Sequence, residues 1–299
     1  MDIILLALLD GIAYAALLFL VAVGLTLIFG VLGILNIAHG SLYAIGAYVT
    51  ATIGTWLVAN GYNPWLTFPA LIVSAILVGV ILGGLIERLL LSRIYTKEPI
   101  LQLLITFAVF MILENLQRMI WGVQPYFLDT PLTLLGNVSL AGVNYTLYQV
   151  AFLPLAAIAV LVFLRYFLRH TTMGAQILAV TEDREAASSI GINATWVYFV
   201  TFVIGASFAA LGGALATPTT SLVTGMGANM IVLSFAVAAT AGLGQIEGAA
   251  VSALMIGIAR SFAVYLAPEI EVVMPYLIMV LVLLVRPNGL FGKETVRKI

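Results

Sequence analysis

The sequence has no cysteine, only two histidines and few charged residues. Without cysteine, the 299-residue chain has no disulfide, no thiolate metal site and no cysteine nucleophile. The two histidines, His39 and His170, stand outside any cluster of acidic residues, which leaves no metal-ligand spacing. Charged residues make up 8% of the chain and hydrophobic residues 63%, whereas soluble domains carry about 25% charged residues. This composition predicts an integral membrane protein.

The sequence also lacks the signatures of nucleic-acid binding, ATP binding and catalysis. Its formal net charge of -1 provides no basic field for nucleic acid. No Gly-x-x-x-x-Gly-Lys-Ser/Thr motif occurs, so any step that requires energy would draw it from another chain or from an ion gradient. No paired carboxylates, His-x-x-x-His or Ser/Lys arrangement is placed for chemistry. We therefore expect no enzyme activity and no cofactor in this chain.

Long apolar runs dominate what remains. A membrane-spanning helix needs about 20 apolar residues. Strand-like alternation at barrel spacing is absent, so we predict an all-α, polytopic transmembrane helical bundle of eight to ten spans, forming one domain over residues 1–299. The first run has neither the positive charge nor the cleavage site of a signal peptide, and we expect it to be a span. Nine spans is the best count, at 3–29, 33–58, 66–92, 99–121, 147–168, 196–216, 226–243, 248–266 and 273–286.

Lysine and arginine predict the orientation, because they concentrate in cytoplasmic loops. Under the nine-span count, ten of the twelve lysine and arginine residues lie on one side of the membrane, and the other two, Arg118 and Arg260, lie inside spans. The C-terminus is then cytoplasmic and the N-terminus external. The residues on the cytoplasmic side are Arg88, Arg93, Lys97, Arg165, Arg169, Arg184, Arg286, Lys293, Arg297 and Lys298, and the acidic residues opposite them are Asp2, Asp129, Glu269 and Glu271.

Residues 172–192 form a charged segment in this otherwise apolar chain, on the cytoplasmic side. We predict two short helices, the first over Met173–Val180 and the second capped by Thr181, with acidic residues in its first turn. Gly191 is a typical helix stop. An apolar face of Ala186, Ala187 and Ile190 indicates a docking partner, and the alternative is an ordinary solvated loop.

Polar residues inside the apolar runs are the candidates for a substrate path, because they are costly in lipid and face the bundle interior or a cavity. Asn36, His39 and Ser41 lie among glycines that permit a helix break or close packing. They line a path or form a packing seam; Thr106 is a further candidate for the path. Glu114 and Arg118, four residues apart, favour a structural ion pair. Outside the membrane, residues 124–148 predict a small external β-hairpin.

Several motifs resemble the permease subunits of branched-chain amino acid ABC importers, the LivH/LivM family. The resemblance is carried by residues 24–48 (GLTLIFGVLGILNIAHGSLYAIGAY), the segment 172–192, the Gly-rich turn 241–249 (AGLGQIEGA) and residues 286–292 (RPNGLFG). The resemblance runs over nearly the whole chain, and the four motifs occur in the same order as in the family. It implies an importer in which two ATP-binding cassette subunits bind the ATP, a second permease or a copy of this chain completes the membrane domain, and an external binding protein delivers the substrate.

The resemblance implies a bundle surrounded by membrane lipid, in the inner membrane of a bacterial or archaeal cell. It also implies roles for individual residues. Residues 172–192 correspond to the segment that docks on the ATPase, and the substrate is a small hydrophobic amino acid, or alternatively urea or a short amide. The chain departs from the family at Ala175 and Leu178, where arginines are common, and at Arg260, where a glutamate is common. The ATPase-coupling residues are Gly174, Glu182, Asp183, Arg184, Ala186, Ala187 and Gly191, and the translocation-path residues are Asn36, His39, Ser41, Thr106, Glu114 and Arg260.

Two expectations remain open from the sequence. Arg260 could pair with Glu114 or with Glu247. An ion-coupled secondary transporter that uses Glu114, Arg118, Arg260 and His39 is the alternative from another class, and it would take up substrate without an ATPase.

Overall fold

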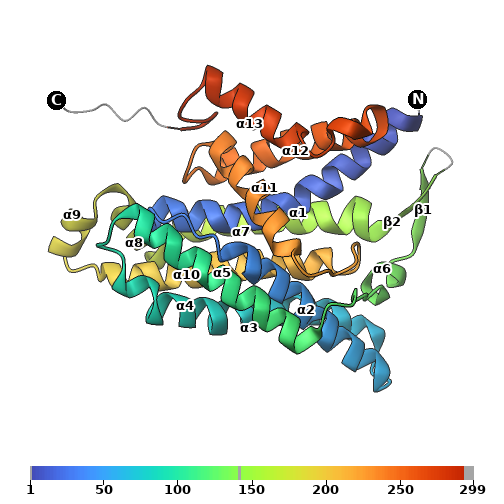
Figure 1. The fold of residues 1–299 in the computed structure, drawn as a ribbon, viewed down its shortest axis with the longest axis horizontal. Coiled ribbons are helices and arrows are strands. Elements are labelled where there is room, and N and C mark those ends of the chain that lie inside the picture. The colour runs from blue at the N-terminus through green and yellow to red at the C-terminus, as the bar shows by residue number, and fades with distance from the viewer. Residues whose placement is uncertain (1, 141–142, 293–299) are drawn as a thin grey trace.

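The computed structural model describes residues 2–140 and 143–292 of the chain. Nearly all of this part is helical, as the apolar runs predict (Figure 1). The long helices are α1 (Asp2–Leu32), α2 (His39–Ala59), α5 (Pro99–Trp121), α7 (Leu153–His170), α10 (Ala194–Ala216) and α12 (Ile246–Leu266); α3 (Thr67–Val78), η2 (Gly79–Gly83) and α4 (Gly84–Leu89) follow one another without a break; the shorter elements are η1 (Pro64–Leu66), η3 (Leu91–Arg93), α6 (Thr130–Leu134), η4 (Tyr148–Phe152), α8 (Thr172–Glu182), α9 (Arg184–Ser189), α11 (Met226–Ala241), η5 (Pro268–Ile270) and α13 (Met274–Val285).

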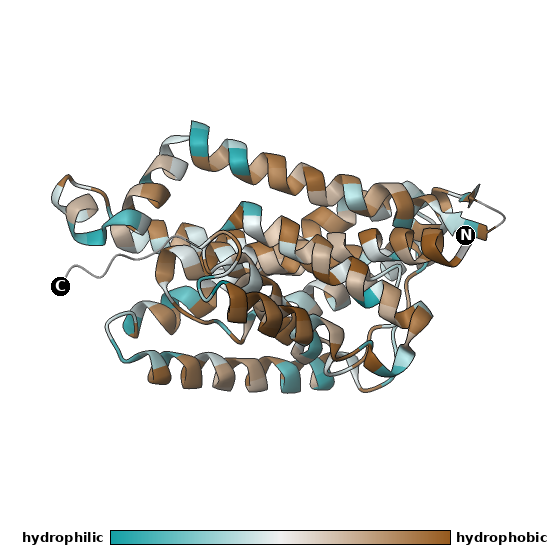
Figure 2. Ribbon diagram, turned by 90° about the horizontal axis from the view of Figure 1, so that it is seen from above, coloured by the Kyte–Doolittle hydropathy of each residue, from teal (hydrophilic) through white to brown (hydrophobic). Residues whose placement is uncertain are grey.

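The predicted spans all form apolar helices, but two of them are short. In the described residues, seven helical stretches are long and apolar enough to cross a membrane. Helices α11 and α13 have 16 and 12 residues. At about 1.5 Å per residue they are shorter than a bilayer core of about 30 Å. Figure 2 shows hydrophobic residues along the helices and hydrophilic residues concentrated toward the two ends of the molecule, as a membrane bundle requires.

Helix α1 forms the centre of the bundle. Its middle stretch is fully buried, and it packs against α7, α10, α11 and α12. Glycines allow these approaches: a Cβ on Gly11 would stand 2.8 Å from the Ile258 Cα, and a Cβ on Gly24 would collide with the Gly205 backbone. Small residues at helix contacts are typical of membrane bundles, where backbones must come close.

The two ends of the bundle differ in character. The N-terminal end of α1 lies at the same end as the hairpin formed by β1 (Asn137–Leu140) and β2 (Val143–Thr146) (Figure 1). Their antiparallel pairing confirms the predicted hairpin, and its external position stays a prediction. Helices α8 and α9, together with the described C-terminal residues, lie at the opposite end (Figure 1). This arrangement matches the predicted placement of the two termini on opposite sides of the membrane. Lys293, Arg297 and Lys298, which supported that orientation, lie outside the described residues.

A break separates α1 from α2 inside the bundle. Gly33 has a φ of 69°, and residues 33–36 are not helical. Asn36 and His39 are fully buried although the chain is turning there. The glycines of the sequence therefore serve both predicted purposes, a break at Gly33 and close packing at Gly40, where a Cβ would collide with the Gly227 backbone.

Candidate coupling segment and translocation path

Helices α8 and α9 form the angled pair expected in residues 172–192. The Thr171 hydroxyl caps α8 by accepting a hydrogen bond from the Gly174 amide at 3.0 Å. The Asp183 carboxylate caps α9 by accepting from the amides of Glu185 at 2.9 Å and Ala186 at 3.0 Å. Such caps satisfy amides that have no partner within the helix. Beyond α9, Gly191 adopts a φ of 92°, which confirms it as the helix stop.

The predicted cap at Thr181 was wrong. Thr181 lies inside α8, and its hydroxyl donates to the Ile177 carbonyl at 2.8 Å. The helix therefore continues to Glu182, and the bend falls at Asp183, whose carboxylate accepts two amide bonds at once. The acidic residues are consequently divided between the end of α8, the bend and the first turn of α9.

The inner face of this segment is packed tightly against the bundle. Ile177 and Val180 are buried, and α8 contacts α1, α7 and α10. Gly174 touches the end of α7, because a Cβ there would stand 2.6 Å from the Leu168 Cα. Ala187 is also buried, and the Arg184 guanidinium lies 5.2 Å from the centre of the Tyr198 ring on α10. Gly174, Arg184 and Ala187 therefore hold the segment against the bundle, and their part in coupling stays a prediction.

The outer face carries both apolar and charged residues. Leu178 is 45% exposed and Ile190 is 77% exposed, which are large values for aliphatic side chains. Ala175 and Ala186 are exposed beside them, and the charged turn over 182–185 continues the same surface. We call these residues (Ala175, Leu178, Glu182, Asp183, Glu185, Ala186 and Ile190) the coupling surface.

The polar residues at the α1–α2 break are enclosed by helices. His39 Nε2 lies 2.9 Å from the Val21 carbonyl oxygen. The Thr106 hydroxyl on α5 donates to the Leu35 carbonyl at 3.2 Å, and the Ser41 hydroxyl donates to the Phe110 carbonyl at 3.4 Å. Both amide atoms of Asn36 and the Nδ1 of His39 are buried without a hydrogen-bond partner among the described residues. These residues hold α1, α2 and α5 together in this conformation, and their place on a substrate path stays a prediction.

The ion pair expected on α5 is present. Arg118 Nη2 lies 3.0 Å from Glu114 Oε1, and the arginine side chain is 49% exposed. Gly225, which precedes α11, lies next to the Glu114 carboxylate. The pair is therefore a contact within one helix at the outer end of the bundle.

Arg260 pairs with Glu271, so both expected partners, Glu114 and Glu247, were wrong. Glu247 begins α12 and Arg260 lies near its end, about 20 Å away along the helix axis. Glu271 follows η5 directly after α12 and so returns to the same end. Glu247 instead lies 3.4 Å from Arg165 and 3.6 Å from Arg169, both on α7.

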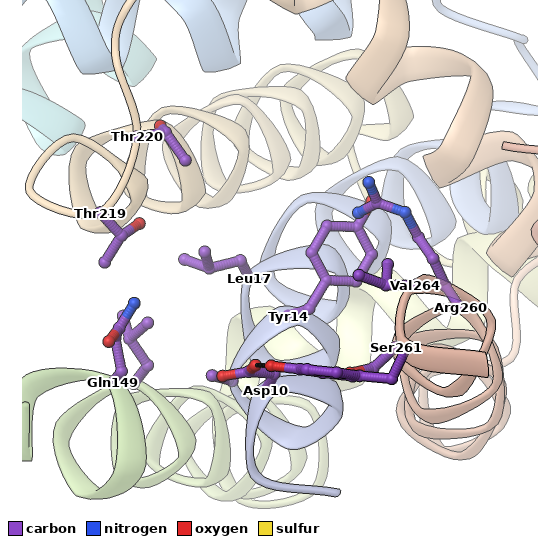
Figure 3. Close-up of a pocket in the computed structure, with 12 residues that line it drawn as sticks. Asp10, Tyr14, Leu17, Gln149, Thr219, Thr220, Arg260, Ser261 and Val264 are labelled. Atoms are coloured by element: carbon purple, nitrogen blue, oxygen red, sulfur yellow. Dashed lines mark hydrogen bonds between the residues drawn. The ribbon is translucent and has the colours of Figure 1, made fainter. Parts of the chain in front are cut away.

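Arg260 lines a cavity of about 350 Å³ near the N-terminal end of α1, shown in Figure 3. We call it the outer cavity, because the predicted orientation places this end of the bundle outside. Its guanidinium lies 4.2 Å from the centre of the Tyr14 ring, within the range of a cation–π contact. On the neighbouring turn of α1, the Asp10 carboxylate accepts a hydrogen bond from the Tyr265 hydroxyl at 2.5 Å. The rest of the wall comes from α1 and α12, from η4 and α7, and from the segment between α10 and α11: Leu17, Ser261, Val264, Gln149, Leu153, Thr219 and Thr220.

The β1–β2 hairpin packs against two residues of the cavity wall, Asp10 and Tyr265. Tyr145 on β2 is buried, and its phenol interacts with Asp10 and Tyr265. Burial, together with the nearby Asp10 charge, raises the pKa of Tyr145, so this phenol stays neutral at physiological pH. Sequence reasoning found Arg260 but missed Asp10, Tyr14 and Gln149. A signal was available for Asp10, which is an acidic residue inside the long apolar run of α1.

A second cavity, of about 230 Å³, lies between α1, α7 and α12. Its wall is almost entirely apolar and includes Phe19, Leu161 and Leu254. Elsewhere along the same two helices, the contacts of Glu247 with Arg165 and Arg169 connect α12 to α7.

Comparison with known proteins identifies the family. The model of the family described as "Branched-chain amino acid transport system / permease component" matches residues 7–283. The chain belongs to this permease family. The permease is similar to the high-affinity branched-chain amino acid transport system permease protein LivH of Escherichia coli K12, with 30% identity over 97% of this chain and 96% of the relative.

Two more distant relatives agree. The permease is 27% identical to the BraD permease protein of Pseudomonas aeruginosa, over 98% of this chain and 97% of the relative. It is 29% identical to a probable branched-chain amino acid transport permease protein of Methanocaldococcus jannaschii, over 95% of this chain and 91% of the relative. No solved structure matches. The permease is a multi-pass inner-membrane component of an importer, as the motifs of the sequence predict.

Proposed function

We propose that this permease forms the membrane path of an ATP-driven importer for small hydrophobic, branched-chain amino acids. The relatives named for branched-chain amino acid transport support this substrate class. An alternative substrate for the same machinery is urea or a short amide. The complete importer would contain two ATP-binding cassette subunits, which bind the ATP, a second permease or a copy of this chain, and an external binding protein.

The coupling surface is the observation that carries this proposal. Helices α8 and α9 are capped, packed against three helices of the bundle and exposed on one face. A segment held in this way transmits displacement to α7 and α10 rather than absorbing it. Leu178 and Ile190 remain in water in the isolated chain, and an ATPase groove that covered them would gain apolar burial. In the orientation that we propose for the membrane, α8, α9 and the C-terminus are cytoplasmic, and the N-terminus and the hairpin are external.

Acidic substitutions on the coupling surface test the proposal. We expect Leu178→Asp combined with Ile190→Asp to lower the amount of ATPase that copurifies with the permease about tenfold or more, because each change buries a charge in an apolar contact. Uptake into vesicles should fall in parallel. Asp183 is unsuitable for this purpose, since its replacement would also remove the cap of α9.

Val123→Asp is the matched control, because Val123 is 66% exposed and follows α5 at the opposite end of the bundle. It should leave copurification unchanged. Full copurification and uptake in the double variant would rule out the coupling surface as the ATPase contact. Uptake driven by an ion gradient, with no ATPase present, would favour the secondary transporter.

A further inference from the structure

We propose that the outer cavity is a binding site for the amino acid zwitterion, with Asp10 receiving the α-ammonium group and Arg260 the α-carboxylate. The inference rests on the proposed function, which supplies the substrate class but assigns it no site within the permease. It begins from the presence of both charge signs on the wall of one cavity.

Asp10 and Arg260 line one cavity because α1 and α12, which carry them, approach closely at Gly11. The Arg260 guanidinium lies against Tyr14, one turn from Asp10 on α1, and Tyr265, one turn from Arg260 on α12, donates to Asp10. The two charges are therefore linked through neighbouring residues of the same helix pair. This places the acid and the base on one wall, as the two ends of an α-amino acid backbone require.

Each charged group retains hydrogen-bonding capacity for a ligand. Arg260 is held by Glu271 on one edge and by the Tyr14 ring on one face, and its side chain is still 29% exposed. A planar guanidinium has further N–H donors in a fork that fits a carboxylate. The Asp10 carboxylate has about four lone-pair sites, more than the hydroxyls of Tyr265 and Tyr145 use, and can also accept from an ammonium. Fixing both groups in advance lowers the entropic cost of binding.

The remaining wall fits the rest of such a ligand. Gln149 uses its amide oxygen to accept from the Thr146 hydroxyl at 2.9 Å, which leaves its NH₂ group available. The amide points into the cavity in Figure 3. The hydroxyls of Thr219 and Thr220 donate to the Ala216 carbonyl, so their oxygens remain acceptors. Leu17, Leu153 and Val264 supply apolar surface for an aliphatic side chain.

The absence of cysteine from the chain allows a direct test on the assembled importer. Val264→Cys and Thr220→Cys each place one thiol on the cavity wall. The rate at which a water-soluble maleimide modifies that thiol is measured with and without millimolar L-leucine, in the absence of the binding protein. We expect leucine to slow modification several-fold at both positions. Ser139→Cys, on exposed strand β1, is the control and should react at the same rate with or without leucine.

Leucine analogues separate recognition of both charges from simple filling of the cavity. Leucinamide lacks the carboxylate and 4-methylpentanoate lacks the ammonium, so each should protect the thiols much less than leucine. Urea should not protect. Equal protection by leucine and both analogues, no protection by leucine, or equal slowing at Ser139→Cys would each overturn the proposal, and none of these outcomes depends on a variant of the charged residues.

Two variants connect the protection to the named groups. Asp10→Asn in the Val264→Cys background should abolish protection by leucine, whereas Arg118→Gln, on α5 outside the cavity, should preserve it. ATP-driven leucine uptake by the Val264→Cys importer is measured in parallel. Uptake without protection would overturn this site and leave the proposed function intact, whereas protection without ATP-driven uptake would support the site and contradict the proposed function.

Discussion

At the residue scale, single glycines determine how closely the helices pack. A Cβ on Gly46 of α2 would stand 2.5 Å from the Ala210 Cα on α10. We expect Gly46→Ala to destabilise the protein by about 1–3 kcal/mol, the usual cost of overpacking a filled contact. Thermal unfolding of the purified permease in detergent measures this as a lower melting temperature.

Gly84→Ala provides the control at the same scale. A Cβ at Gly84 would meet the Phe199 ring at 3.6 Å and the Val203 side chain at 3.9 Å, both ordinary contacts. Alanine in a helix interior is favoured over glycine by about 0.5–1 kcal/mol, so this variant should melt at the same temperature or slightly higher. Equal destabilisation by both variants would contradict the proposed role of the Gly46 contact.

The polar residues show what a sequence reveals at this scale and what it conceals. Asn36, His39, Thr106 and Arg260 are recognisable because each is costly in an apolar run. Hydrogen bonds between helices are not recognisable, because the two partners lie far apart in the chain. The Tyr265 hydroxyl that donates to Asp10, for example, is 255 residues away. Pairing across helices depends on how the helices pack, and one sequence does not record that packing.

At the scale of elements, Asp183 determines where α8 ends and α9 begins. Replacing an N-cap residue by alanine costs about 0.5–2 kcal/mol. We therefore expect Asp183→Ala to fray α9, with faster hydrogen exchange at the amides of Glu185 and Ala186, which the carboxylate now binds. Asp183→Asn keeps an oxygen acceptor and should retain slow exchange. Similar fast exchange in both variants would contradict the capping role.

The positions of the helices followed from the length of the apolar runs, whereas their ends did not. The predicted spans became helices because each run must satisfy its backbone inside lipid. The cap of α9 was misplaced, since Thr181, Glu182 and Asp183 are adjacent and each has some capping or first-turn preference. Only the hydrogen bonds of the folded bend distinguish them.

At the scale of the whole molecule, α7 connects the proposed ligand site to the coupling end. It contributes Leu153 to the cavity wall at its start and leads directly into α8 at its end. The apolar stretch that contains α7 is the least buried of the seven in the described residues, at 17%. Its contacts with α12 include the ion pairs of Glu247 with Arg165 and Arg169. A displacement of α8 that moved α7 away from α12 would have to separate these charges.

We expect Glu247→Gln to raise the basal ATP hydrolysis rate of the reconstituted importer at low salt, because the resting arrangement loses its ion pairs. The three side chains are more than half exposed. Such pairs contribute at most about 1 kcal/mol, which limits the increase to about fivefold. Salt screens them, so the wild-type rate should rise toward that of the variant between about 10 mM and 1 M salt, while the variant changes little. Arg118→Gln removes an ion pair within one helix and should keep the wild-type salt response. If Glu247→Gln retained that response as well, the contacts between α7 and α12 would not restrain the motion that the coupling surface receives.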